Sequence, residues 1–154
     1  MPTLNLPVSE MIAVDVFDTV SEVTTQNGFN YTLAVARHMK TGDKRTHLSA
    51  LIVQDDPHEV TNENYNTREW LLPFSIGVYL IPTDNDATPI DTYVNLVTAD
   101  VQKALMIDRY RGGNALDTKI KAPHLITEEG SFDLVLIQVE VSYRTAEIDP
   151  YLRA

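Results

Sequence analysis

Two stretches of the chain repeat apolar residues at the spacing of an amphipathic helix. In Glu10–Thr25 the apolar positions fall on one side and the acidic positions on the other. Ser9 is a candidate N-cap for this segment, and Asn27-Gly28 ends it. The second stretch begins at Thr88-Pro89-Ile90-Asp91, where a capping threonine and a proline at the first helical position favour helix initiation. Its apolar spacing continues to Leu105, so the pattern predicts two helices.

The second helix carries more apolar residues than one buried stripe requires. Outside the stripe lie Leu96, Ala99, Met106 and Ile107. A helix that is apolar beyond its core face often packs on a second surface, which we expect here to be another subunit. Leu96, Ala99 and Met106 are therefore candidate subunit-interface residues.

Three segments before the second helix have the composition of strands. Tyr31–His38 alternates apolar and small or polar residues, and Thr46–Gln54 follows after the turn Lys40–Lys44, so the two are predicted to form a hairpin. Glu69–Ile81 is a long apolar strand. Pro73 near its start favours an edge position or a bulge.

The second half contains one strong strand signal. Phe132–Tyr143 is apolar on both faces in its first half, which is typical of a central or doubly covered strand. The other segments are predicted to be irregular: the loop Asp55–Thr67, the turn Arg111–Asn114, the loop Pro123–Gly130 with a short extended piece near Ile120, and the polar tail Thr145–Ala154.

The predicted order is helix, three strands, helix, strand. It indicates a single α+β domain over residues 1–154, with a mainly antiparallel sheet of about four strands and two packed helices. Apolar residues make up 44% of the 154 residues and charged residues 22%, which suits one globular domain. The absence of cysteine excludes disulfides and thiolate metal sites.

Targeting and charge narrow the function classes. Met1–Glu10 lacks the pattern of a secretory signal, and the longest apolar stretch, Leu71–Pro82, is too short to cross a bilayer, so we expect a soluble intracellular protein. Twelve basic and 22 acidic residues give a formal net charge of −10. This sign disfavours tight binding to nucleic acid or to an anionic membrane.

Two acidic segments are the candidates for metal binding. Asp55–Glu59 places three carboxylates and one imidazole within five residues, but Pro57 interrupts it, and a solvated loop is the favoured interpretation. Asp84-Asn85-Asp86 opens like a calcium loop. Pro89 and Asn95 stand where that loop needs glycine and glutamate, so we reject this interpretation.

No catalytic signature is present, and we predict no catalytic, cofactor-binding or metal-binding residues and no cofactor. His38, His47 and His124 are scattered and are expected at strand ends or in loops. Arg109 and Arg111 before the glycine pair can hold an anion, but basic residues at a helix C-terminus followed by a glycine turn are the favoured interpretation.

Aromatic and arginine side chains near the end of the chain suggest self-association. Trp70 is expected in the core or in an interface. Tyr143, Arg144 and Tyr151 lie at the end of an apolar strand and in the tail behind it. Because tyrosine and arginine are enriched at interface hot spots, these three residues are further candidate interface residues.

The second half also resembles a known family. The segment VNLVTADVQKALMIDRYRGGNALD (Val94–Asp117) and the segment FDLVLIQVEVSYRTAEIDPY (Phe132–Tyr151) resemble small virion proteins of tailed bacteriophages, in the tail terminator or tail-completion group. The resemblance rests on Asp100-Val101, Ala104-Leu105, Gly112-Gly113, Val139-Glu140-Val141, Tyr143-Arg144-Thr145 and Asp149-Pro150-Tyr151. It does not extend to the part before Thr88, although the order of elements along the chain is similar.

The resemblance implies a subunit of a six-membered ring that caps the tail tube and joins it to the head connector. Its partners would be copies of itself, the tube protein and the connector, in the virion after assembly in the host cytoplasm. DNA would pass through the ring without specific binding. Two alternatives stay open: another head–tail joining or neck protein, and a small metal- or ligand-binding enzyme domain that uses Asp55–Glu59 and His124.

Overall fold

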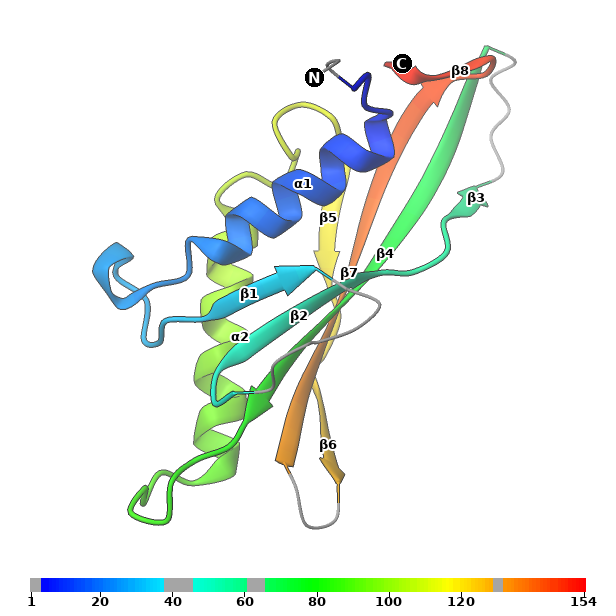
Figure 1. Ribbon diagram of the computed structural model, residues 1–154. Coiled ribbons are helices and arrows are strands. Elements are labelled where there is room, and N and C mark those ends of the chain that lie inside the picture. The colour runs from blue at the N-terminus through cyan, green and yellow to red at the C-terminus, as the bar shows by residue number, and fades with distance from the viewer. Residues whose placement is uncertain (1–3, 38–45, 61–65, 129–131) are drawn as a thin grey trace.

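Two helices pack on one face of a single eight-stranded sheet in the computed structural model (Figure 1). The structure describes residues 4–37, 46–60, 66–128 and 132–154. The elements in chain order are α1 (Val8–Ser21), a 3-10 turn (Thr25–Asn27), β1 (Ala34–Arg37), β2 (Ser49–Gln54), β3 (His58–Val60), β4 (Thr67–Leu80), α2 (Ile90–Met106), β5 (Asp117–Ile120), β6 (His124–Glu128), β7 (Phe132–Ala146) and β8 (Asp149–Arg153). The α+β class is therefore confirmed.

The sheet has more strands than the hydrophobic pattern predicts. Strands β3, β6 and β8 fall in segments predicted to be loops or tail, and β5 is the short extended piece expected near Ile120. Each of these strands has at most five residues, and β6 and β8 are solvent-exposed along most of their length. Strands β3, β6 and β8 have no buried face to impose alternation, so long-range pairing decides their conformation.

Strands β4 and β7 form the centre of the sheet. They pair antiparallel from Thr67↔Ala146 to Leu80↔Asp133. The sheet continues on one side of this pair through β2 to β1, with β3 beside the start of β4. Strands β5, β6 and β8 lie along the other side of β7. The central position predicted for Phe132–Tyr143 is confirmed.

The predicted hairpin between the first two strands is wrong, because β1 and β2 are parallel. An alternating pattern looks the same in parallel and antiparallel strands, so it could not give the direction. The predicted strand Tyr31–His38 also begins later, at Ala34. His38 and the predicted turn Lys40–Lys44 lie outside the described residues.

Pro73 lies in the central strand β4, so the edge alternative is wrong. The bulge alternative fits, because residues 55–57 lie opposite only Leu72 and Pro73. The Pro73 carbonyl accepts a hydrogen bond from the Asp55 amide at 2.9 Å, so its nitrogen faces the same side of the strand. On that side β2 ends opposite Phe74 and β3 begins opposite Leu71. The proline therefore occupies the gap between two short neighbours, where the ladder needs no donor.

The helices begin close to the predicted positions but without the predicted caps. The N-cap of α1 is Pro7 and not Ser9, and the N-cap of α2 is Pro89 and not Thr88. Neither cap makes a side-chain hydrogen bond. Within the described part of the chain, neither helix is long or apolar enough to span a bilayer.

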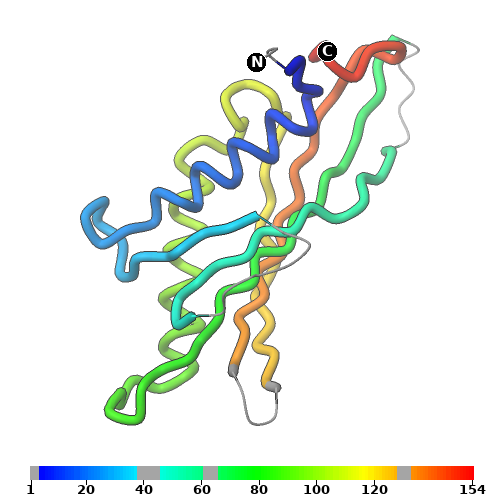
Figure 2. Tube along the Cα trace, viewed as in Figure 1, coloured from blue at the N-terminus to red at the C-terminus, as the bar shows by residue number. Residues whose placement is uncertain are grey.

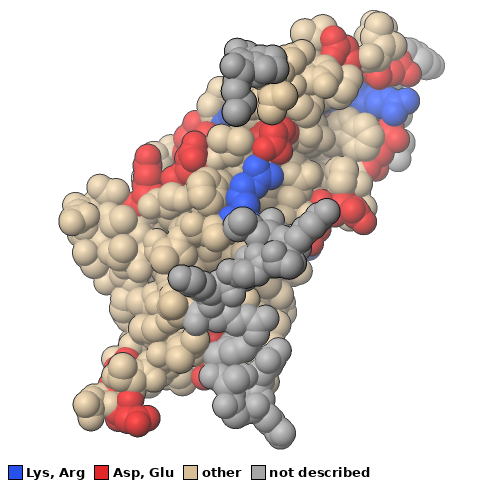
Figure 3. Space-filling view, viewed as in Figure 1, with Lys and Arg blue, Asp and Glu red and all other residues tan. Residues whose placement is uncertain are grey.

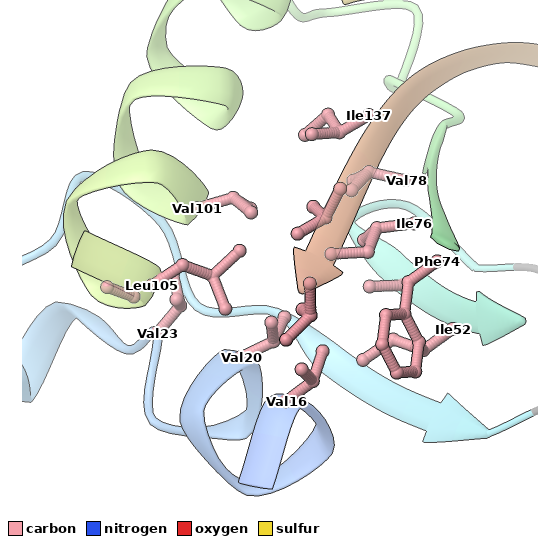
Figure 4. Packing of buried hydrophobic residues seen from close by; sticks show 14 of the residues in the cluster. Val16, Val20, Val23, Ile52, Phe74, Ile76, Val78, Val101, Leu105 and Ile137 are labelled. Atoms are coloured by element: carbon pink, nitrogen blue, oxygen red, sulfur yellow. The ribbon is translucent and has the colours of Figure 1, made fainter. Parts of the chain in front are cut away.

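The core fills the space between the helices and one face of the sheet. Figure 4 shows Val16 and Val20 of α1 and Val101 and Leu105 of α2 pointing towards the sheet residues. The sheet contributes alternate positions of three strands: Ala50 and Ile52 of β2; Leu72, Phe74, Ile76, Val78 and Leu80 of β4; Val135, Ile137, Val139, Val141 and Tyr143 of β7. This alternation places one face of each strand beneath the helices.

Neither of the two described helices covers the opposite face of the sheet (Figure 1), and the two halves of this face differ in chemistry. Towards the end of β7 it holds ion pairs, including Arg144–Glu69 at 3.3 Å and Lys121–Glu140 at 2.5 Å. Towards the start of β7 it holds half-buried apolar side chains, among them Leu134 and Tyr79, which are paired across the strands. Sequence periodicity could place residues on this face but could not show that the face lacks a helix.

Candidate functional site

The segment before α1, the C-terminus and the β7–β8 hairpin meet at one end of the molecule (Figure 2). A hollow of about 290 Å³ opens there, lined by Ser9, Pro57, Arg68, Trp70, Tyr143, Thr145, Ala146, Glu147, Ile148 and Pro150. Burial raises the pKa of Tyr143, and a hydrogen bond with Ser9 acts in the opposite direction. Ile148 at the hairpin turn is 94% exposed. The hollow therefore combines aromatic walls, one arginine and a projecting apolar side chain, a set that suits contact with another protein.

The structure brings three of the candidate interface residues together. Tyr143 and Arg144 lie in β7 and Tyr151 in the adjoining β8. Tyr143 is 5% exposed and belongs to the core, whereas Arg144 and Tyr151 are exposed. Arg144 pairs with Glu69 across the strands.

The other three candidates lie on α2. Ala99 is exposed and Leu96 and Met106 are half buried. Leu96 and Ala99 lie in the middle of the helix, and Met106 is its last residue. A second hollow, of about 370 Å³, lies between the ends of the two helices, where Lys103 sits over the Phe29 ring at 5.2 Å and Ile107 is exposed.

Arg111 is buried, which sequence reasoning missed. Its Nη1 donates to Asp15 Oδ1 at 2.9 Å, and its Nη2 donates to the carbonyls of Leu105 and Asp108. Burial lowers the pKa of Arg111, and the charges of Asp15 and Asp108 partly compensate. The expected glycine turn is present, with φ of 68° at Gly112 and 85° at Gly113. The arginine therefore holds the end of α2 and does not present an anion site to solvent.

Asp100 is a second buried charged group that the sequence did not reveal. Its carboxylate accepts hydrogen bonds from the amides of Asn30 and Tyr31 and from Asn30 Nδ2, at 3.0 to 3.2 Å. These bonds hold the segment before β1 against α2, which explains why β1 begins only at Ala34. The partners are 70 and 69 residues away, so no local pattern could have identified them.

An aromatic cluster lies near the start of α2. Tyr93 donates its hydroxyl proton to Asp86 and packs against the Tyr31 and His47 rings, with centroids 5.5 and 5.2 Å away. The hydrogen bond raises the pKa of Tyr93 and lowers that of Asp86. His47 Nδ1 accepts from the Ile81 amide at 3.0 Å. Both phenols stay protonated at neutral pH, because burial also raises the pKa of Tyr31.

The acidic segment Asp55–Glu59 is solvent-exposed, and its last two residues start β3. In this segment Asp55 accepts a hydrogen bond from Ser75. The described residues contain no group of three or more side chains that could hold a metal ion. The structure also does not bring His124 to this segment: His58 pairs opposite Leu71 of β4, whereas His124 shares a row with Gly77, about 20 Å along the strand.

No family model and no curated protein matches this chain.

Proposed function

We propose that the protein is a structural protein of a tailed-bacteriophage virion, a tail terminator that forms a six-membered ring on the end of the tail tube. The observation that carries the proposal is the resemblance of Val94–Asp117 and Phe132–Tyr151 to that group. The two segments are α2 with its glycine turn, and β7 with β8. The Leu116 amide donates to the Ser142 carbonyl at 2.7 Å, so the two resembling segments also contact each other.

Surface chemistry supports a role in assembly. Large apolar side chains are exposed at several places of the described surface: Leu4, Leu6, Val60, Ile107, Tyr110, Leu116, Leu125, Ile126, Ile148, Tyr151 and Leu152. Clusters of such side chains commonly mark protein contacts. A terminator needs contacts of two kinds, with its own copies around the ring and with the tube below.

The net charge suits a channel that lets DNA pass. Six copies at −10 each carry a formal charge of −60. Acidic side chains are spread over the face in Figure 3, and basic ones appear at fewer places. Acidic residues facing the lumen would repel phosphate and keep DNA from adhering. Replacing those residues with lysine should slow DNA exit, and an unchanged rate of ejection would contradict this part of the proposal.

Electron micrographs of phage particles produced without this protein test the function. A terminator predicts tails of irregular excess length. Tails of correct length that fail to join heads would instead favour the second candidate, another head–tail joining protein. Normal, infectious particles would contradict both.

A further inference from the structure

Strands β1 and β6 are edge strands on opposite sides of the sheet, and the same row of paired residues joins them. The register pairs Val35 of β1 with Ala50, Ala50 with Val78, Val78 with Val135, and Val135 with Leu125 of β6. One row of paired residues therefore crosses five strands and ends at β1 on one side and at β6 on the other (Figure 1). Among the described residues, neither β1 nor β6 has a strand on its outer side.

The side chains of the two edge strands also face the same way. Val35 and Leu125 end a row whose inner members are buried beneath the helices. The next row lies on the helix-free face and runs from Ala36 through Leu51, Gly77 and Leu136 to His124. Ala34 and Ile126 belong to this same face, because each lies two residues from the row.

Four of the five residues of strand β6 carry no charge or proline that would protect an edge; Glu128 is the last residue of the strand, and Pro123 directly precedes it. Residues His124 to Thr127 are all exposed and include no lysine, arginine or carboxylate. Leu125 is 45% and Ile126 40% exposed. Monomeric proteins usually guard an edge with charges, proline, a bulge or a covering element, since an open edge pairs with other chains.

Strand β1 also has no strand on its outer side among the described residues, although α1 packs against it. Ala34 and Ala36 are exposed and small. The only charged side chain of the strand, Arg37, is held by Glu10 at 2.7 Å. The edge therefore offers backbone groups to an incoming strand with little steric or electrostatic opposition.

We propose that β6 of one copy pairs with β1 of the next copy, so that the sheets of successive subunits join into one closed ring. This inference rests on the proposed function, in which the chain assembles with itself. Strand β6 runs antiparallel to β1, and rotation about an axis along the strands keeps these directions, so the new pair is antiparallel. The contact is head-to-tail, as ring closure requires, and in the closed ring both β1 and β6 of every subunit are paired.

The side chains fit this pairing on both faces. Leu125 extends the buried row beside Val35 of the neighbour, and Ile126 lies against the small side chains of Ala34 and Ala36. Pairing thus removes from water two of the large apolar side chains that the single subunit exposes.

Cysteine pairs test the contact directly, because the natural chain contains no cysteine. Double variants combine Ala34→Cys or Ala36→Cys with His124→Cys or Ile126→Cys. All four positions lie on the helix-free face, and the four combinations also detect a pairing of β6 with β1 that is shifted by two residues. A disulfide requires Cα atoms about 4.4 to 6.8 Å apart. The matched control pair is Ala36→Cys with Ile148→Cys. Ile148 is more exposed than Ile126, but it follows the end of β7 at Ala146. Ala146 lies about 33 Å along β7 from Leu136, the β7 residue in the row of Ala36 and His124.

Mild oxidation of the assembled protein should give at least one double variant a ladder of covalent oligomers on a non-reducing gel, and reduction should return this ladder to monomer. The control pair and every single variant should stay uncrosslinked. A covalent dimer of the single variant Ile126→Cys would overturn the proposal, since it requires two β6 strands to face each other. If wild-type protein forms rings and no pair cross-links, the strand pairing is wrong and the proposed function stands. Protein that stays monomeric contradicts both.

A charge variant gives an independent measurement. Leu125→Lys combined with Ile126→Lys should leave the fold intact, since both side chains are exposed, and should shift the protein to monomer in light scattering. Ile148→Lys is the control and should keep the wild-type mass. Equal masses for the two variants would contradict the pairing, provided that circular dichroism shows both to be folded.

Discussion

Arg111 and Asp15 form an ion pair that ties the end of α2 to the middle of α1. Nη1 lies 2.9 Å from Oδ1, and the arginine side chain is 0% exposed. The same guanidinium donates to two carbonyls at the helix end, so it replaces the partners that the last turn of α2 lacks. The two residues are 96 positions apart, so this ion pair is a long-range contact that holds the two helices together.

Arg111→Met should lower the free energy of unfolding by about 2–4 kcal/mol, because a partly buried carboxylate and two carbonyls lose their donor. Urea denaturation measures the loss. Arg109→Met is the control: this residue pairs with Asp117 at 2.6 Å at the surface, where ion pairs contribute little. Equal midpoints for the two variants would contradict the role of Arg111.

Asp100→Ala should destabilise the protein by about 2–3 kcal/mol, since the amides of Asn30 and Tyr31 lose a buried acceptor. Asp100→Asn should cost less, because its carbonyl oxygen still accepts. Hydrogen exchange measures the local effect, with faster exchange of both amides in Asp100→Ala. Unchanged exchange would show that other contacts hold this segment.

The Tyr93–Asp86 hydrogen bond predicts a specific pH dependence. The folded pKa of Asp86 lies below its unfolded value of about 4, so its stabilisation is present above that pH and is lost as the pH falls through the lowered pKa. The folded pKa of Tyr93 is raised, so its stabilisation is present below about pH 10 and is lost as the pH rises through the raised pKa.

Tyr93→Phe should therefore be less stable than wild type between about pH 4 and pH 10, with the difference shrinking on both sides of that window. Denaturation curves at a series of pH values measure it. Tyr110→Phe is the control, since Tyr110 is exposed, and it should follow wild type throughout. A constant difference across all pH values would contradict the linkage.

The glycine turn after α2 allows a matched comparison. Gly113 has φ of 85°, and a Cβ there would lie 3.1 Å from Arg153 Nη1. Gly28 has φ of 89°, with nothing within 4 Å of the same atom. Gly28→Ala should cost about 1 kcal/mol of backbone strain, and Gly113→Ala should cost more because Arg153 must also move. Thermal unfolding of both variants measures the difference, and equal losses would show that the Arg153 contact is unimportant.

Periodicity predicted the elements that bury one face. The sequences of the two helices repeat apolar residues along one stripe, and those of β2, β4 and β7 are apolar at the positions that face the core. The structure has all five elements within a few residues of the predicted bounds. The pattern failed where partners lie far away in the chain. It did not show the direction of β1, the short strands β3, β6 and β8, or the burial of Asp100 and Arg111, because each depends on contacts that no local spacing encodes.

For the candidate interface residues, too, local spacing predicted some positions, and contacts distant in the sequence decided the others. Spacing correctly left Ala99 outside the buried stripe of α2, and Ile107 is also exposed. It placed Tyr143 among surface candidates, although the chain end that covers this residue could not be foreseen. Leu125 and Ile126 were assigned to a loop, and only the strand register places them at an edge.

The native mass of the purified protein tests the central claim, that this chain works through surfaces which bind further copies of itself. Light scattering on a size-exclusion column, over a range of concentrations, measures that mass against the 17.3 kDa of one chain. Six times the chain mass is the predicted result, independent of dilution over the working range. A single-chain mass at every concentration would contradict the account.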